Sequence, residues 1–147
     1  MYDYKGTIVD GVCRQTSYET CGAASMVTLL NSKGISTTEG EMARLSMTAP
    51  RLGLSPQGAA YGLKRKLGQL GRSEDVSIKV PELKDLHKLP KPFLAGIKFS
   101  FRTNHMICVL ETAEDGLVVG DPISTGRKTW SLKNFRKMWS GIVIICN

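Results

Sequence analysis

The sequence has no apolar run long enough to cross a bilayer, since stretches such as residues 142–146 are far shorter than the ~20 residues of a membrane helix. It also has only four cysteines, Cys13, Cys21, Cys108 and Cys146, with no CxxC pair among them. This pattern argues against a disulfide scaffold and against a zinc module, although a Cys13–Cys146 disulfide stays open. A P-loop, a GxSxG elbow and metal-ligand spacings are absent as well, so neither a metal nor a cofactor is predicted.

Acidic residues are outnumbered, because 20 Lys and Arg face 13 Asp and Glu and leave a net charge of +7. We interpret the excess as a solvated basic face; the alternative is attraction to an acidic peptide, an anionic membrane surface or nucleic acid. Basic residues interleaved with aromatics are missing, so no nucleic-acid partner is predicted. Residues 1–5 lack the basic and apolar segments of a secretory signal, and we predict a reducing, cytoplasmic location.

Helix signals dominate the first half of the chain and strand signals the second. Helices are predicted from the N-cap Thr20 to Gly34, from a capping box at residues 38–41, and from Ser55-Pro56 to Gly71, with close packing at Gly58 and Gly62. Further expected elements are strands at 6–12, 76–80, 93–99, 106–110, 117–120 and 142–146, a loop at 48–54, and short helices at 81–89 and from Ser131 through Trp139. The order predicts one α+β domain, residues 1–147, with an N-terminal helical part on a mostly antiparallel C-terminal sheet.

Cys21 lies in the first turn of the first predicted helix, directly after a polar loop. Unpaired backbone N–H groups and the positive end of the helix dipole favour a thiolate there. Gln15, six residues upstream in the loop, can direct its amide to the same place as a donor to an oxyanion. The alternative is a buried structural cysteine on an ordinary helix.

A cysteine nucleophile needs a base, and the chain has only two histidines. His87 sits among charged residues at the end of a short predicted helix, which is typical of a surface residue. His105 opens the buried strand run 105–110. On its own, His105 would be an ordinary histidine at the edge of a sheet.

A carboxylate is predicted beside His105 by the hairpin that follows it. Strands 106–110 and 117–120 close near Asp115-Gly116, so that facing residues have numbers that sum to about 229. Asp121 then falls opposite about residue 108, at the same open end as His105, and a change of one residue in register would move it closer or turn it away. Such a carboxylate orients the imidazole and stabilises the imidazolium.

These residues resemble the C39 peptidases, papain-like cysteine peptidase domains of bacteriocin transporters that remove leader peptides after a double glycine. The similarity runs nearly end to end. It rests on Gln15 with Cys21-Gly22, on Asn104-His105, on residues 117–122 and on residues 135–142. The resemblance implies a papain-like fold and a Cys21, His105 and Asp121 triad, with Gln15 in the oxyanion hole.

The resemblance also implies partners and leaves alternatives open. Expected partners are a peptide or protein substrate, such as a Gly-Gly leader peptide, and an ABC transporter at the cytoplasmic face of the membrane. A cationic cluster of Lys64, Arg65, Lys66 and Arg72 is a candidate contact for acidic leader residues. One alternative is a papain-like toxin or effector, protease or deamidase, delivered into a target cell and paired with an immunity protein. The other is a leader-binding domain without catalysis.

Overall fold

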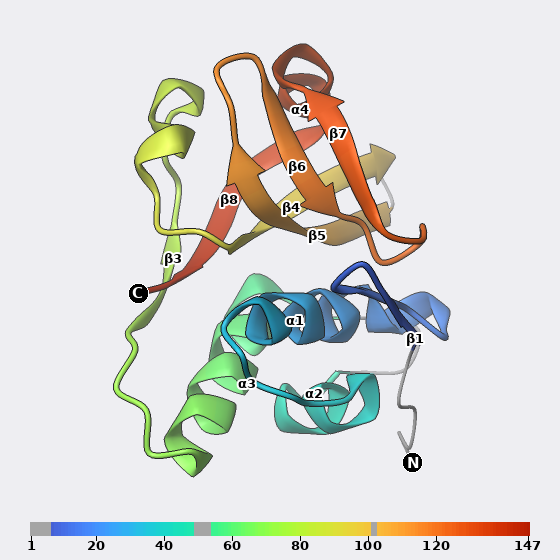
Figure 1. Ribbon diagram of the computed structural model, residues 1–147, viewed down its shortest axis with the longest axis vertical. Coiled ribbons are helices and arrows are strands. Elements are labelled where there is room, and N and C mark those ends of the chain that lie inside the picture. The colour runs from blue at the N-terminus through green and yellow to red at the C-terminus, as the bar shows by residue number, and fades with distance from the viewer. Residues whose placement is uncertain (1–6, 49–53, 101–102) are drawn as a thin grey trace.

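Helices α1 (Cys21–Ser32) and α3 (Pro56–Gln69) lie against one side of a twisted sheet in the computed structural model, which describes residues 7–48, 54–100 and 103–147, and α2 (Glu39–Leu45) packs on these two helices (Figure 1). The other helical elements are α4 (Leu132–Met138) and the 3-10 turns η1 (Tyr18–Thr20) and η2 (Leu83–Lys88). The strands are β1 (Thr7–Val9), β2 (Val12–Arg14), β3 (Val76–Lys79), β4 (Phe93–Ser100), β5 (Thr103–Thr112), β6 (Gly116–Gly120), β7 (Arg127–Ser131) and β8 (Trp139–Cys146). The predicted α+β arrangement is therefore confirmed. Most of the loop predicted at 48–54 lies outside the described residues.

Both predicted glycine ends of the long helices are confirmed. Gly34 and Gly71 follow α1 and α3 with positive φ angles of 79° and 68°, which a residue without Cβ adopts at no steric cost. The close packing predicted at Gly62 is confirmed too, because a Cβ added there would lie 2.7 Å from Ser46 Cβ. Helix α3 thus approaches the end of α2 closely.

The main sheet has six strands in the order β3-β8-β4-β5-β6-β7, and every neighbouring pair is antiparallel. Strand β7 was not predicted, because its residues are mostly exposed and show no apolar alternation. It is defined by pairing with β6 at the edge of the sheet. Trp139, predicted on the last helix, instead begins β8 and pairs with Ile97. Its ring still stacks on Phe135, with 5.4 Å between the centroids.

The single strand predicted at residues 6–12 is wrong. Residues 7–14 form a hairpin of β1 and β2 in which Val9 pairs with Val12. Asp10 and Gly11 make the turn with φ angles of 53° and 78°, as a two-residue type I′ turn requires. Asp10-Gly11 is therefore an Asp-Gly turn signal like the one used above at residues 115–116, and it was overlooked in predicting a single strand.

The two faces of the main sheet carry separate apolar clusters. Residues such as Leu94, Met106 and Cys108 belong to one cluster with α1, α2 and α3, while Ile107 and Val109 belong to a cluster with η2 and α4. This alternation along β5 follows the two-residue period of a strand. The sheet is thus covered on one face by α1 and α3, with β5 directly against α1, and α2 packs on these two helices.

Candidate active site

Cys21 is the first residue of α1 and the only one of the four cysteines that is half-buried rather than buried. All four are free, so the Cys13–Cys146 disulfide left open by the sequence is not formed. Burial, together with the nearby charge of Glu39, raises the pKa of the Cys13 thiol to about 12. Burial also raises the pKa of the Cys108 and Cys146 thiols, which disfavours the reactive thiolate, whereas Cys21 is half-buried at a helix start.

The His105 imidazole is joined to the Asp121 carboxylate, as the hairpin reasoning predicted. The distance from His105 Nε2 to Asp121 Oδ1 is 2.7 Å, and both residues are buried. The same carboxylate oxygen accepts a hydrogen bond from the Ile123 backbone N–H at 3.2 Å. The carboxylate is thereby held in place as a partner for one ring nitrogen.

A β-bulge decides the register of this hairpin. Near its turn, Glu111 pairs with Val118, as predicted, but beyond the bulge Val109 pairs with Val119 and Cys108 with Gly120. The extra residue advances β6 by one position toward His105. Asp121 therefore lies closer to the imidazole than the regular ladder places it.

The His105 ring also forms a hydrogen bond with the Cys21 side chain. Burial by itself lowers the pKa of His105, but the hydrogen bonds with Asp121 and Cys21 and the negative charges of both outweigh it. Together they raise the pKa of His105 to about 9. Because Asp121 occupies Nε2, the other ring nitrogen is the one available to the thiol.

Ser25, which sequence reasoning missed, ties the helix to the strand at this point. It lies one turn after Cys21, and its hydroxyl donates to the Met106 carbonyl at 2.9 Å, one residue after His105. The signal for it was the spacing of four residues from Cys21, which places both side chains on one face of the helix. This buried bond fixes the thiol against the imidazole.

Gln15 lies next to the Asp121–Pro122 segment, but its side-chain amide forms hydrogen bonds within its own loop. Its backbone N–H donates to the Pro122 carbonyl at 2.8 Å, directly after Asp121. Its side-chain Nε2 donates to the carbonyls of Ser17 at 2.9 Å and of Tyr18 at 3.4 Å, and its Oε1 is buried without a partner among the described residues. The oxyanion role of Gln15 stays a prediction. Breaking the longer hydrogen bond, to the Tyr18 carbonyl, would free one amide hydrogen to bind an oxyanion.

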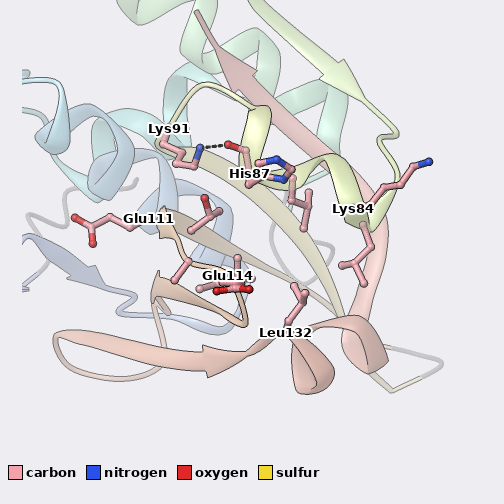
Figure 2. A pocket seen from close by; sticks show the side chains of 11 residues that line it. Lys84, His87, Lys91, Glu111, Glu114 and Leu132 are labelled. Carbon is pink, nitrogen blue, oxygen red and sulfur yellow. Dashed lines mark hydrogen bonds between the residues drawn. The ribbon is translucent and has the colours of Figure 1, made fainter.

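A hollow of about 810 Å³ lies elsewhere, between η2, the β5–β6 turn and the start of α4 (Figure 2). Its apolar residues include Leu86, which belongs to the cluster on the face of the sheet away from α1. His87 lines it, beside Lys91, whose Nζ donates to the His87 carbonyl at 2.7 Å. None of the four predicted site residues lines this hollow, so the second histidine is remote from Cys21.

Half of the predicted cationic cluster is neutralised within the protein. Lys66 is buried and pairs with Glu41 at 2.8 Å, and Arg72 pairs with Glu74 at the same distance. Arg65 donates to the Leu45 carbonyl at 3.0 Å. Within the described residues, no group of His, Cys, Asp or Glu could hold a metal ion, and no helix is long and apolar enough to span a membrane.

A thiol at a helix start, facing an imidazole and a carboxylate from an antiparallel sheet, is the arrangement of a papain-like peptidase domain. The chain belongs to the peptidase C39 family, whose model matches residues 10–147. No sequence among the curated proteins matches it.

Solved structures with the same fold include peptidase domains of transporters. The peptidase domain of Streptococcus ComA, a bi-functional ABC transporter involved in a quorum-sensing pathway, is 22% identical, with 92% of this chain and 96% of that chain covered and a TM-score of 0.79. A double glycine motif protease from an AMS/PCAT transporter, in complex with the leader peptide, is 20% identical over 98% and 94% of the chains, with a TM-score of 0.74. A C39-like peptidase from Bacillus anthracis is 10% identical over 96% and 94%, with a TM-score of 0.69.

Replacing Cys21 with Ser is expected to lower the pKa of His105 below its value of about 9 in the wild type. The substitution removes the Cys21 sulfur, whose hydrogen bond and charge raise the pKa of His105, and leaves Asp121 in place. An NMR titration of the ring protons measures the change, with the exposed His87 as an internal reference. An unchanged His105 pKa in this variant would show that the thiol and the ring do not interact.

Proposed function

We propose that this protein is a cysteine endopeptidase in which Cys21 is the nucleophile and His105 the general base. One observation carries the proposal. The His105 ring hydrogen-bonds both the Cys21 side chain and the Asp121 carboxylate, so the three side chains form one connected series. A raised His105 pKa suits this chemistry, because an imidazolium beside the thiol stabilises the thiolate at neutral pH.

The reaction follows from the positions of these groups. His105 accepts the thiol proton, and the Cys21 sulfur attacks the peptide carbonyl carbon to form a tetrahedral oxyanion. The Cys21 backbone N–H and the Gln15 side chain hold that oxyanion. His105 then donates its proton to the leaving amine as the C–N bond breaks, and Asp121 keeps the ring oriented. Water, deprotonated by His105, hydrolyses the thioester and restores the free thiol.

The proposed substrate is a leader peptide cleaved after a double glycine. Support comes from the matched double glycine motif protease with its leader peptide and from the transporter peptidase domain. An ABC transporter is accordingly the proposed partner, and it would hold this domain at the cytoplasmic face of a membrane. Acidic leader residues remain candidate partners of Lys64, since two other members of the cationic cluster are already paired.

Incubation with a set of leader peptides tests the substrate, with the cleavage site read by mass spectrometry. We expect one cut after Gly-Gly, and a drop of roughly 100-fold or more when the glycine before the cut is replaced by Val, because an added side chain must fit a site shaped for none. Cys21→Ala is the control for cleavage by a contaminant. Cuts that do not depend on glycine would contradict the leader assignment, and a mass gain of about 1 Da at a glutamine would indicate a deamidase instead.

No specific observation favours the toxin or effector alternative. The leader-binding alternative without catalysis is weakened by the intact pairing of Cys21 with His105.

A further inference from the structure

Glu39, in the first turn of α2, is a fully buried carboxylate outside the proposed triad, with 0% of its surface exposed. A buried carboxylate is costly unless hydrogen bonds compensate for the water it loses. Here the compensating donors come from the loop that leads to Cys21. The Thr16 backbone N–H donates to Glu39 Oε2 at 2.7 Å, the Thr16 hydroxyl donates to Oε1, and the Thr20 side chain also hydrogen-bonds the carboxylate.

The two threonines mark both ends of the segment between the proposed oxyanion donor and the nucleophile. Thr16 directly follows Gln15, and Thr20 directly precedes Cys21. Inside the segment, the Thr20 hydroxyl oxygen accepts a hydrogen bond from the Ser17 backbone N–H at 3.2 Å, which keeps the segment folded as a turn. Glu39 therefore holds the segment at its two ends from a separate helix.

The surroundings of Glu39 show which form of the carboxyl the hydrogen bonds favour. Burial raises the pKa of Glu39, the bonds from Thr16 and Thr20 oppose that rise, and the charge of Glu19 adds to it. The thiol of Cys13 also faces this charge. Since both carboxylate oxygens accept hydrogen bonds from Thr16, the geometry suits an acceptor and not a donor.

We propose that Glu39 is a positioning residue, which sets the distance between the Gln15 amide and the Cys21 thiol by clamping Thr16 and Thr20. This inference rests on the proposed function, because it assigns Gln15 to the oxyanion. Glu39 does not reach the reacting atoms itself. Glu39 is proposed to position the oxyanion donor Gln15. The Cys21–His105 pair is held separately by the hydrogen bond from Ser25 to the Met106 carbonyl.

The test compares Glu39→Gln with Glu41→Gln. Glu41 is a matched control on the same helix, a carboxylate bonded to Lys66 at 2.8 Å and to Thr37, away from the loop. For Glu39→Gln we expect kcat to fall roughly 10- to 100-fold with KM changed less than about threefold, as misplaced catalytic groups lose rate and not binding. Glu41→Gln should retain kcat within about twofold, because the Glu41 carboxylate is bonded to Lys66 and Thr37 and does not contact the loop that leads to Cys21.

Two further readouts separate positioning from general damage. Alkylation of Cys21 by iodoacetamide should keep its wild-type rate in Glu39→Gln, because the thiol and imidazole stay paired. Adding Glu39→Gln to Gln15→Ala should cost little beyond Gln15→Ala alone, since both act on one interaction. Equal losses in the Glu39 and Glu41 variants, additive losses with Gln15→Ala, or a parallel fall in alkylation would each overturn the proposal.

A measurement without substrate tests the role of Glu39 independently of the peptidase assignment. The Thr16 backbone amide proton and the Gln15 side-chain amide protons are expected to shift in the NMR spectrum of Glu39→Gln and not in that of Glu41→Gln. If Glu39→Gln does not fold, Thr16→Val removes one of the same hydrogen bonds from an exposed residue, with an expected fall in kcat of roughly 3- to 10-fold. Unchanged Gln15 resonances or an unchanged kcat would overturn the clamp even if the wild type cleaves leader peptides.

Discussion

Replacing Cys21 or His105 with Ala is expected to lower kcat/KM by roughly 10⁴-fold or more, because these two groups act as one unit in forming the thiolate. Without the sulfur no acyl-enzyme forms, and without the imidazole neither the thiol nor the leaving amine has a proton partner. Initial rates on a Gly-Gly leader peptide measure the loss. The double variant should be hardly slower than either single one, since groups that work together are not additive.

His87→Ala is the matched control for this loss, as the other histidine of the chain lies beside the hollow away from Cys21. It should keep its activity within about twofold of the wild type, as exposed residues usually tolerate substitution. Circular dichroism melting checks that the variants stay folded. Wild-type cleavage by Cys21→Ala or His105→Ala, with folded protein, would refute the assignment of the site.

Replacing Asp121 with Asn is expected to lower kcat/KM by roughly 10²- to 10⁴-fold, and to lower the pKa of His105. Asn keeps the size of the side chain but loses the charge that favours the imidazolium, and its amide can present a donor to Nε2 in place of an acceptor. The His105–Asp121 contact of 2.7 Å is therefore lost or weakened without an empty space being left. Kinetics and an NMR titration of the ring measure the two effects.

The same variant should change how stability depends on pH. The folded-state pKa of His105 is raised from 6.5 to about 9, so the folded protein holds this proton more tightly than the unfolded chain. The resulting stabilisation is fully present below pH 6.5 and is lost as the pH rises through 9. In Asp121→Asn the decline between those values should be smaller. Urea unfolding at several pH values measures it, and equal declines in both proteins would show that Asp121 does not hold the imidazolium.

Ionic interactions around the site differ in what they contribute. Lys66–Glu41 joins α3 to α2 from a partly buried position, whereas Arg72–Glu74 lies on the surface. Hydrogen bonds and the charges of Lys66 and Arg44 lower the pKa of Glu41 against the effect of its burial. Neither ion pair touches the Cys21–His105 contact. Lys66–Glu41 thus contributes to the packing of α3 on α2, whereas Arg72–Glu74 joins two residues of the loop between α3 and β3.

Several features of the fold were readable from local patterns. The helix starting at Cys21 and its glycine end at Gly34 followed from capping preferences and apolar spacing, because these depend on residues within a few positions of each other. Alternation likewise located β5 and β6. Strand β7 and the extended backbone at Trp139 were missed, since pairing with a neighbouring strand and not local preference determines both.

The sequence by itself determined the chemical groups of this protein: a cysteine at a helix start, a histidine at a strand mouth and an aspartate at the end of the next strand. The tertiary structure alone decided how near they come, through the β-bulge between Val109 and Glu111 and the Ser25 bond to Met106. It alone also revealed Glu39 on the loop of Gln15. The physical reason is that residue type and spacing follow from local chemistry, whereas register, burial and contacts between distant residues arise only when helices and sheet pack together.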